Sequence, residues 1–202
     1  MTRTAETRSV RITRDSLLSL ESYARERNDF RARVLRHKKP RSVPLGEHVT
    51  LLFEDELTIR YQIQEMLRIE KTFEDAGIQD ELDAYNPLVP DGNNWKATML
   101  VEHEDVDERR RMLSRLKGIE DRVWVQIEAH PRVYAIADED LERENEEKTS
   151  SVHFLRFELK PAMIASLKAG AALSIGVDHP QYSATLREVS EATRAALLAD
   201  LA

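Results

Sequence analysis

The sequence predicts an α+β protein in which N-terminal helical segments pack on a largely antiparallel, mixed sheet. Apolar residues recur at helical spacing mainly within residues 11–90, whereas short alternating or β-branched apolar runs fill residues 91–202. Helices followed by strands on short turns are typical of this class and not of alternating βαβ units. A chain of 202 residues can bury one full core, so we expect a single domain over residues 1–202, with residues 1–10 flexible.

The first half is expected to begin with two helical segments over residues 13–39. A short hairpin follows, with Pro44 and Gly46 at its turn and the β-branched, apolar run VTLLF as its second strand. A helix is then predicted over residues 55–74. Gly77 interrupts the pattern, a short helix carries IQDELDAYN, and the turn-forming run PLVPDGNN closes the helical part.

The second half is expected to be mostly sheet. The runs with the composition of strands are KATMLVEH, DRVWVQI, RVYAI, SVHFLRFEL, ALSIGVD and YSATLREV. The runs with helical spacing are DERRRMLSRLKG, PAMIASLK and SEATRAALLADL. Short turns between the strands favour antiparallel pairing, because parallel strands need long crossover connections.

Composition and motifs exclude several classes of protein. The chain contains no cysteine, so it forms no disulfide, thiolate nucleophile, cysteine-ligated zinc site or cysteine-held iron–sulfur cluster of its own. No apolar run approaches the ~20 residues that span a bilayer, and the N-terminus lacks the apolar segment of a signal peptide, so we expect a cytoplasmic protein without a membrane partner. The sequence also lacks a Gly-rich phosphate loop, a nucleophile elbow and an H-E-x-x-H motif.

Charge is unevenly distributed along the chain. Residues 1–41 carry twelve Lys and Arg against five Asp and Glu, a net charge of +7, and the remainder carries −14. The densest basic run, RARVLRHKKPR at residues 31–41, lacks interleaved aromatic residues and a recognisable reading helix. We therefore expect a solvated helix end or a contact for an acidic protein, and no nucleic-acid partner. The acidic run DEDLERENEEK, residues 138–148, is expected to form an exposed loop or a loose helical turn.

Glu70 is the most unusual position in the helix predicted over residues 55–74. At about 100° per residue it falls near the centre of an arc of apolar residues, between Ile59 and Ile63. Burying an ionised carboxylate without a partner costs several kcal/mol. We therefore expect Glu70 to be buried and either protonated, paired with a cation or bound to a metal ion. Gln62 lies on the edge of the same arc.

The next predicted helix supplies candidate partners for Glu70. Glu81, Tyr85 and Asn86 lie on or beside its apolar face, and a turn at Gly77 could fold that face back onto the first helix. One interpretation is a buried polar knot that fixes the packing of two helices. The other is a metal or small-molecule site, and a helix in a different rotational phase would remove both.

Other polar positions are given simpler roles. Glu65 and Arg68 lie three residues apart on the polar side of the helix, where a surface ion pair is expected. His153 alternates with core residues of its strand, so a hydrogen-bonded structural histidine is favoured over a ligand or base. His179 ends the run ALSIGVD, where a turn residue is favoured over a functional one. The other histidines, expected at the surface or in turns, are His37, His48, His103 and His130.

The sequence resembles an uncharacterised bacterial family known as domain of unknown function 3501. It does so, from near Arg11 to the C-terminus, in the runs ITRDSLLSLESY, VTLLFED, QIQEMLRIE, ELDAYNPLVP, GIEDRVWVQI, VDHPQY and RAALLADL. The joint occurrence, in order, of QIQEM-R-E, E-x-x-x-YN-x-L-x-P and DHP-x-Y is the most specific part. The positions that the resemblance marks as a candidate polar site are Gln62, Glu65, Arg68, Glu70, Glu81, Tyr85, Asn86, His179 and Tyr182.

The resemblance implies a genomic and metabolic context but no defined activity. Members of the family are commonly encoded beside rubrerythrin-like, peroxide-reducing proteins and iron–sulfur oxidoreductases, which implies an accessory or adaptor role in oxidative-stress or redox metabolism with such a protein as partner. The alternative is an enzyme or binding protein with a carboxylate-rich pocket, in which Glu70, Glu81 and His179 are candidate ligands of a transition-metal ion. The family pattern has no fixed histidine at His153, which weighs against a functional role there.

Overall fold

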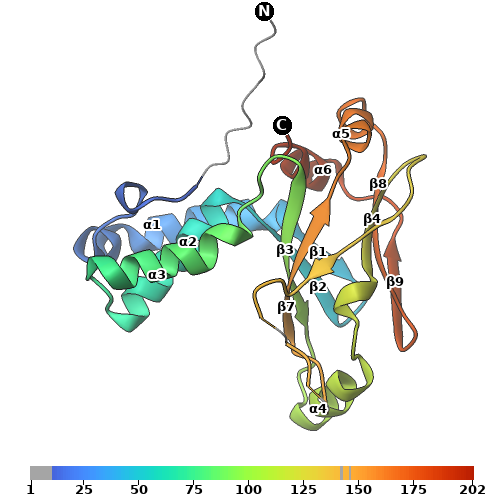
Figure 1. Cartoon of the computed structure of the whole chain (residues 1–202), viewed down its shortest axis with the longest axis horizontal. Helices are drawn as coiled ribbons and strands as arrows, with labels where there is room; N and C mark the ends of the chain where they lie inside the picture. The colour runs from blue at the N-terminus through green and yellow to red at the C-terminus, as the bar shows by residue number, and fades with distance from the viewer. Residues whose placement is uncertain (1–10, 142, 146) are drawn as a thin grey trace, which may run out of the picture.

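The computed structural model describes residues 11–141, 143–145 and 147–202, so the expectation for residues 1–10 lies outside the described part. Three helices lie together on one side of the molecule, and the strands with the remaining helices form the other side (Figure 1). The helices are α1 (Leu20–Lys38), α2 (Glu56–Glu70), α3 (Asp75–Tyr85), α4 (Val106–Arg115), α5 (Pro161–Lys168) and α6 (Glu191–Leu198). The strands are β1 (Ser42–Leu45), β2 (Val49–Glu54), β3 (Asn94–Val101), β4 (Val123–Ile127), β5 (Val133–Tyr134), β6 (Ile136–Ala137), β7 (Val152–Glu158), β8 (Leu173–His179) and β9 (Tyr182–Leu186).

The strands form two sheets. The order is β1-β2-β3-β7-β6 in the five-stranded sheet and β5-β4-β8-β9 in the four-stranded sheet. Every pair of described strands is antiparallel. The α+β prediction is therefore confirmed, while the expected mixed sheet is corrected to two antiparallel ones. The hairpin β1–β2 from the first half of the chain completes the five-stranded sheet beside β3.

One apolar core joins the two sheets. Alternate residues of β3, including Trp95 and Met99, face this core because side chains of a strand point to opposite faces in turn. Ile175 and Val177 of β8 reach it from the four-stranded sheet. The indole nitrogen of Trp95 donates a hydrogen bond of 2.8 Å to the carbonyl oxygen of Leu197, so α6 is held over the same core. Burial of one such side chain contributes roughly 1.5–3 kcal/mol to folding.

The three N-terminal helices have a smaller core of their own. Ile59, Ile63 and Leu67 follow one another at four-residue spacing on α2 and pack with Ile78 and Leu82 of α3. Figure 1 shows α2 lying between α1 and α3, and both neighbours contact it. No helix among the described residues is long and apolar enough to cross a membrane.

Arg41 joins the helical part to the sheets. It ends the 3₁₀ turn η2 (Lys39–Arg41), and only 2% of the residue is exposed. Its guanidinium binds both carboxylate oxygens of Asp200, after α6, at 2.8 Å each. It also lies 3.0 Å from Asp55, the residue that caps α2, and Asp55 in turn lies 2.5 Å from Nε2 of His37. One buried cation therefore ties the end of α1, the start of α2 and the C-terminal segment together.

We predict that Asp200→Asn lowers the free energy of unfolding by about 3 kcal/mol, because it leaves the charge of Arg41 buried with one carboxylate fewer. The control is Asp83→Asn, which breaks the exposed ion pair between Arg11 and Asp83. Surface pairs contribute little, so this control should stay within about 0.5 kcal/mol of the unmodified protein. Urea unfolding measures both variants. An equal loss of unfolding free energy in the two variants would show that Arg41 does not hold the helical part to the sheets.

Candidate functional site

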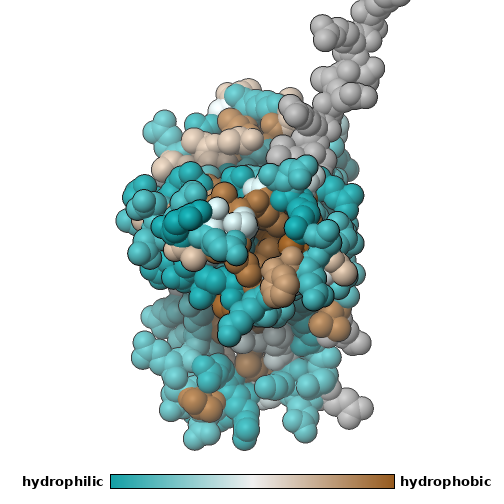
Figure 2. Space-filling model, turned by 90° about the vertical axis from the view of Figure 1, so that its left-hand side faces the viewer, coloured by the Kyte–Doolittle hydropathy of each residue, from teal (hydrophilic) through white to brown (hydrophobic). Residues whose placement is uncertain are grey.

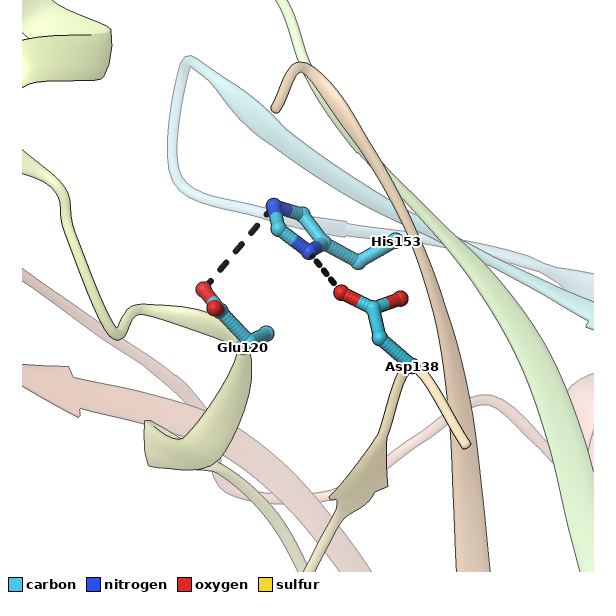
Figure 3. Close-up of side chains that lie close together, drawn as sticks. All are labelled: Glu120, Asp138 and His153. Carbon is cyan, nitrogen blue, oxygen red and sulfur yellow. Dashed lines mark hydrogen bonds and ion pairs between the residues drawn. The ribbon is translucent and has the colours of Figure 1, made fainter. Parts of the chain in front are cut away.

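His153 lies in the core on strand β7. The strand alternates, so His153 faces the same side as Leu155 and Phe157, and the residue is 0% exposed. Met99 of β3 is its partner in the antiparallel ladder. Its Nδ1 lies 2.6 Å from Oδ2 of Asp138 (Figure 3), the distance of a strong, charge-assisted hydrogen bond. The expectation of a core-facing, hydrogen-bonded histidine is confirmed.

Asp138 is held in place by its own backbone. It follows β6 with φ at 49°, in the left-handed region that only a few non-glycine residues, Asp among them, tolerate. Its amide donates to the carbonyl oxygen of Phe154 at 2.8 Å, and its Oδ1 accepts from the amide of Phe154 at 2.9 Å. Arg143 lies 3.3 Å from the same oxygen. The strained backbone and these contacts leave Oδ2 aimed at His153.

Glu120 approaches the other side of the imidazole ring. It belongs to the 3₁₀ turn η4 (Glu120–Arg122), which precedes β4, and it is 8% exposed. Its Oε2 lies 3.8 Å from Nε2 of His153, and the hydroxyl of Thr149 donates to the same oxygen at 3.5 Å. Burial raises the pKa of Glu120 above its ordinary value. A positive charge near this carboxylate would therefore lower the free energy of its ionised form.

Two further oxygen atoms surround Nε2 of His153. The hydroxyl of Thr149 and the carbonyl oxygen of Ser150 each lie 3.1 Å from it. Because Oδ2 of Asp138 accepts a hydrogen bond from Nδ1–H, a ring with a single proton carries a lone pair at Nε2, which faces the hydroxyl of Thr149 and the carboxylate of Glu120. A second proton, or a metal ion, at Nε2 would satisfy the carbonyl oxygen and the carboxylate as well.

A surface pocket of about 320 Å³ leads to the two carboxylates. Its lining residues are Gly118, Glu120, Asp121, Ala137, Asp138, Arg143 and Glu144. Four carboxylates and one guanidinium make this pocket acidic, although Glu144 also lies 3.7 Å from the ammonium of Lys117. Within the described part of the chain, Glu120, Asp138 and His153 are the one group of three such residues whose ligand atoms lie within 4.8 Å of one another.

Glu70 is exposed, so the prediction that it is buried is wrong. The rotational phase was correct for the apolar residues Ile59, Ile63 and Leu67, but burial ends at Leu67, and Glu70 is the last residue of α2. Lys71 then turns the chain with φ at 55°. Ile69 and Phe73, apolar residues of the helix predicted over residues 55–74, are 60% and 71% exposed. Figure 2 shows apolar side chains gathered at this end of the helical part, ringed by hydrophilic ones.

A polar knot does fix the helices, but its carboxylate is Glu65. Oε1 of Glu65 accepts from the hydroxyl of Tyr23 at 2.6 Å and from Nε of Arg27 at 2.7 Å, and Oε2 accepts from Arg27 at 2.8 Å. Arg68 adds a fourth bond at 3.3 Å. The bonds from Arg27, with those from Tyr23 and Arg68, outweigh partial burial and lower the pKa of Glu65 to about 2. The expected surface pair of Glu65 and Arg68 is thus part of a bridge between α2 and α1.

Other marked side chains bind backbone atoms. Asn86 accepts from the amide of Ile12 at 2.9 Å and donates to its carbonyl oxygen at 3.0 Å, which holds the segment before α1 against α3. Gln62 is half-buried, whereas the neighbouring Gln64 is buried and makes the equivalent pair of bonds to Leu18. The side-chain amides of Asn86 and Gln64 each bond to the backbone N–H and C=O of one residue, as a neighbouring strand would. They therefore stabilise the irregular segment before α1.

Glu70, Glu81 and His179 do not form a cluster of metal ligands in the described part of the chain. Partial burial and then the negative charge of Glu70 raise the pKa of Glu81, so these two carboxylates interact. Tyr85 is half-buried against the helical core. His179 ends β8, on the other side of the molecule (Figure 1), where its Nε2 donates to the carbonyl oxygen of Lys117 at 3.0 Å.

Tyr182 connects the two sheets. Its hydroxyl donates to the carbonyl oxygen of Leu45 at 2.5 Å and accepts from the amide of His48 at 3.1 Å. A side chain at Gly46 would meet this hydroxyl at 2.5 Å, and Gly46 has φ at 73°, so glycine fits this turn on both grounds. Tyr182 therefore fixes the β1–β2 turn and with it the position of His48.

Sequence reasoning missed Glu120, Asp138 and the burial of His103. Asp138 was placed in the acidic run of residues 138–148, expected to be exposed, yet its side chain is only 10% exposed. The available signal was the break between the run RVYAI and the following acidic residues, where a short strand ends. His103, expected at the surface or in a turn, is 6% exposed.

The fold and site define an α+β protein with two antiparallel sheets, a helical extension and a buried cluster of metal-ligand residue types. The chain belongs to the family described as protein of unknown function (DUF3501), whose model matches residues 11–201. It is similar to a solved structure described as a novel protein of unknown function from Burkholderia pseudomallei. That match has 59% identity and a TM-score of 0.91, and it covers 96% of this chain and 100% of the other. No curated protein matches the sequence.

We predict that Glu65→Gln lowers the free energy of unfolding by about 2 kcal/mol at pH 7, because charge-assisted bonds to Arg27 and Tyr23 are lost. The folded pKa of about 2 lies below the ordinary 4.5, so this stabilisation is complete above pH 4.5 and is lost as the pH falls towards 2. The variant should therefore lose less stability than the unmodified protein over that interval. Urea unfolding at three pH values tests this, with the exposed Glu70→Gln on the same helix as control. Identical acid sensitivity of the two variants would contradict the assignment.

Proposed function

We propose that this protein binds a divalent metal ion between Nε2 of His153 and the carboxylate of Glu120, with Asp138 orienting the ring through Nδ1. The observation that carries the proposal is a fully buried imidazole whose one nitrogen is fixed by a carboxylate while its other nitrogen faces a second carboxylate at 3.8 Å. A histidine that binds metal through one nitrogen usually donates its other N–H to a carboxylate or carbonyl oxygen.

The distances suit an ion on the Nε2 side. Two ligand atoms that each lie about 2.1 Å from one ion are at most about 4.2 Å apart. The separation of 3.8 Å between Nε2 of His153 and Oε2 of Glu120 meets that limit. Thr149 and Ser150 add a hydroxyl and a carbonyl oxygen at 3.1 Å from the same nitrogen. The Nδ1 side is different, since 2.6 Å to Asp138 is a hydrogen-bond distance.

The charges around the site also favour a cation. Glu120 is buried with a raised pKa, and the pocket in front of it carries more carboxylates than cations. A divalent ion would offset the free-energy cost of desolvating the carboxylate of Glu120, and the negative potential of the pocket would attract it. One imidazole among oxygen ligands is a donor set for Mn²⁺ or Fe²⁺ more than for a soft ion such as Cu⁺.

We predict that the purified protein binds one equivalent of Mn²⁺ at this site and that Glu120→Gln weakens this binding at least tenfold. Asp138→Asn should weaken it by 10- to 100-fold, because the ring loses its orienting acceptor. Free Mn²⁺ measured by electron paramagnetic resonance during a titration gives the affinity. Glu70→Gln is the control and should bind as the unmodified protein does. Circular dichroism shows whether each variant is folded.

Two results would count against this metal site. One is the absence of Mn²⁺ and Fe²⁺ binding below millimolar concentration by the unmodified protein. The other is unchanged affinity in folded Glu120→Gln. Either result would leave Asp138 and His153 as a buried hydrogen-bonded pair that only supports the fold, with Glu120 beside it.

A second proposal concerns the setting in which the protein acts. We infer that it is an accessory partner of a redox enzyme, of the rubrerythrin-like or iron–sulfur kind, and that helix α1 is the contact. The observation that favours this is a group of exposed basic residues at and directly after the end of that helix. They are Arg31, Arg33, Arg36 and Lys39. Because the chain has no cysteine, electrons would have to pass through a partner or a bound ion.

We predict that the unmodified protein retains such a redox protein in a pull-down from native lysate and that retention falls as salt is raised. The double variant Arg33→Glu and Arg36→Glu should retain at least tenfold less. Lys160→Glu, an exposed charge reversal on the sheet part, is the control for position. Mass spectrometry identifies the retained proteins. Recovery of nucleic acid and no redox protein would reject this partner class.

A further inference from the structure

Lys96 of β3 lies on the face of the five-stranded sheet that points away from the main core. Its neighbours along the strand, Trp95 and Ala97, are buried in that core, so alternation places Lys96 on the opposite face. The residue is half-buried there. No hydrogen bond or ion pair joins its ammonium group to another described residue. An ammonium that has lost part of its hydration without gaining a partner favours its neutral form, the free amine.

The neighbouring strand β7 places a second cation beside Lys96. Arg156 lies directly opposite Lys96 in the antiparallel register, so two positive charges share one face of the sheet. Arg156 donates from Nε and Nη2 to the two carboxylate oxygens of Glu139 at 2.7 Å each, and from Nη1 to Glu158 at 2.6 Å. These two carboxylates are therefore engaged by the guanidinium, and Lys96 lies beside a fixed cation without an ion pair of its own.

This placement lowers the pKa of Lys96. Burial is the largest cause, and the positive charge of Arg156 is the second. Glu54, opposite Lys96 on β2, accepts a hydrogen bond from Thr98 at 2.7 Å instead of pairing with the ammonium. The carboxylates that act in the other direction, and only in part offset these causes, are Glu139, Asp91 and Glu158. More of the Lys96 amine is therefore unprotonated at neutral pH than in an exposed lysine, and the unprotonated amine is the nucleophile.

Lys96 lines a mainly apolar pocket of about 220 Å³. The apolar residues of its lining are Pro87, Leu88, Phe154 and Leu155. The first two belong to the 3₁₀ turn η3 (Asn86–Leu88), directly after α3, and the other two belong to β7. The remaining charged side chains of the lining already have partners, since Arg156 binds Glu139, and Arg143 binds Asp140 at 2.6 and 2.8 Å. The pocket therefore suits a small, neutral, apolar molecule that reacts with an amine.

We propose that Lys96 captures small, neutral, apolar aldehydes in this pocket as a Schiff base. The lone pair of Nζ attacks the carbonyl carbon, and the carbonyl oxygen takes up a proton to give a carbinolamine. The carbinolamine then loses its hydroxyl group and the remaining N–H proton as water, which leaves a carbon–nitrogen double bond. Amine and aldehyde thus give imine and water, and the step needs no oxidant or reductant. A lysine that is desolvated or lies beside another cation is suited to this reaction.

Arg156 acts in this proposal as a positioning residue. It touches neither bond that changes, and its role is to hold Glu139 and Glu158 away from the amine and to disfavour the ammonium form. The pocket uses the outer face of β7, whereas His153 of the proposed metal site faces the core. The Schiff-base site is therefore separate from the metal site.

The experiment measures which lysines react with benzaldehyde at pH 7 while sodium cyanoborohydride reduces each imine to a stable benzylamine. Peptide mass spectrometry compares the labelling of Lys96 with that of the exposed Lys160 in the same sample. We expect Lys96 to be labelled at least tenfold faster. The polar, anionic aldehyde glyoxylate should show a preference at least threefold smaller, because the apolar walls do not bind it. Equal preference for the two aldehydes would overturn the pocket as the binding site.

Two variants test the roles of the residues. Lys96→Arg keeps the positive charge but forms no imine, so the preferred adduct should be lost while Lys160 is labelled as before. Arg156→Gln removes the neighbouring cation and frees two carboxylates, so labelling of Lys96 should fall at least threefold at pH 7 and recover at pH 9. Arg187→Gln, an exposed change after β9, is the control and should leave the pH profile unchanged. A purely structural role of Arg156 would not produce recovery at high pH.

Two results would overturn the proposal. One is labelling of Lys96 no faster than that of Lys160 in the unmodified protein, a measurement that needs no variant to fold. The other is an unchanged pH profile in Arg156→Gln that circular dichroism shows to be folded. The labelling is made without added metal ion, so its failure would not bear on the Mn²⁺ site, and failure of Mn²⁺ binding would not bear on Lys96.

Discussion

The buried guanidinium of Arg41 is the interaction on which the arrangement of the two cores depends. Asp55, at the start of α2, and Asp200, after α6, approach it from segments far apart in the sequence. An unpaired cation in this position would cost several kcal/mol. Breaking the contact of either segment with Arg41 would therefore lower the stability of the fold strongly. The small helical core is therefore held to the sheets by a directional contact. This coupling also fixes β1, which begins one residue after Arg41 and leads to the turn of His48.

Most elements of the fold could be predicted because period and composition are local properties. The alternation in SVHFLRFEL indicated which residues of β7 face a core, and Leu155 and Phe157 do so. The division of the strands into two sheets could not be predicted in the same way. Alternation defines the two faces of a strand, whereas the identity of its neighbour depends on the whole chain. The run VTLLF thus became β2, beside β3, although a helical block separates them in the sequence.

The error over Glu70 and Glu65 has a related cause. Helical phase places residues around an axis, but burial also requires a neighbour at that level of the axis. Glu70 shares the angular position of Ile59 and Ile63 and yet lies at the open end of α2. Glu65, on the supposed polar side, is covered because α1 packs there, and Arg27 and Tyr23 come with it. A helix between two others has two buried faces, which a single apolar arc does not reveal.

The candidate sites were the hardest part to predict, because their residues come from separate loops and turns. Glu120 and Asp138 stand in ordinary acidic contexts, and only the left-handed backbone at Asp138 and the burial of η4 bring them to His153. Two of the buried histidines, His153 and His103, then differ in their hydrogen bonds. His153 has partners at both nitrogens, so its ring is positioned before any ligand arrives. Among the described residues His103 has no hydrogen-bond partner at either nitrogen, and its ring stacks on that of His48 instead.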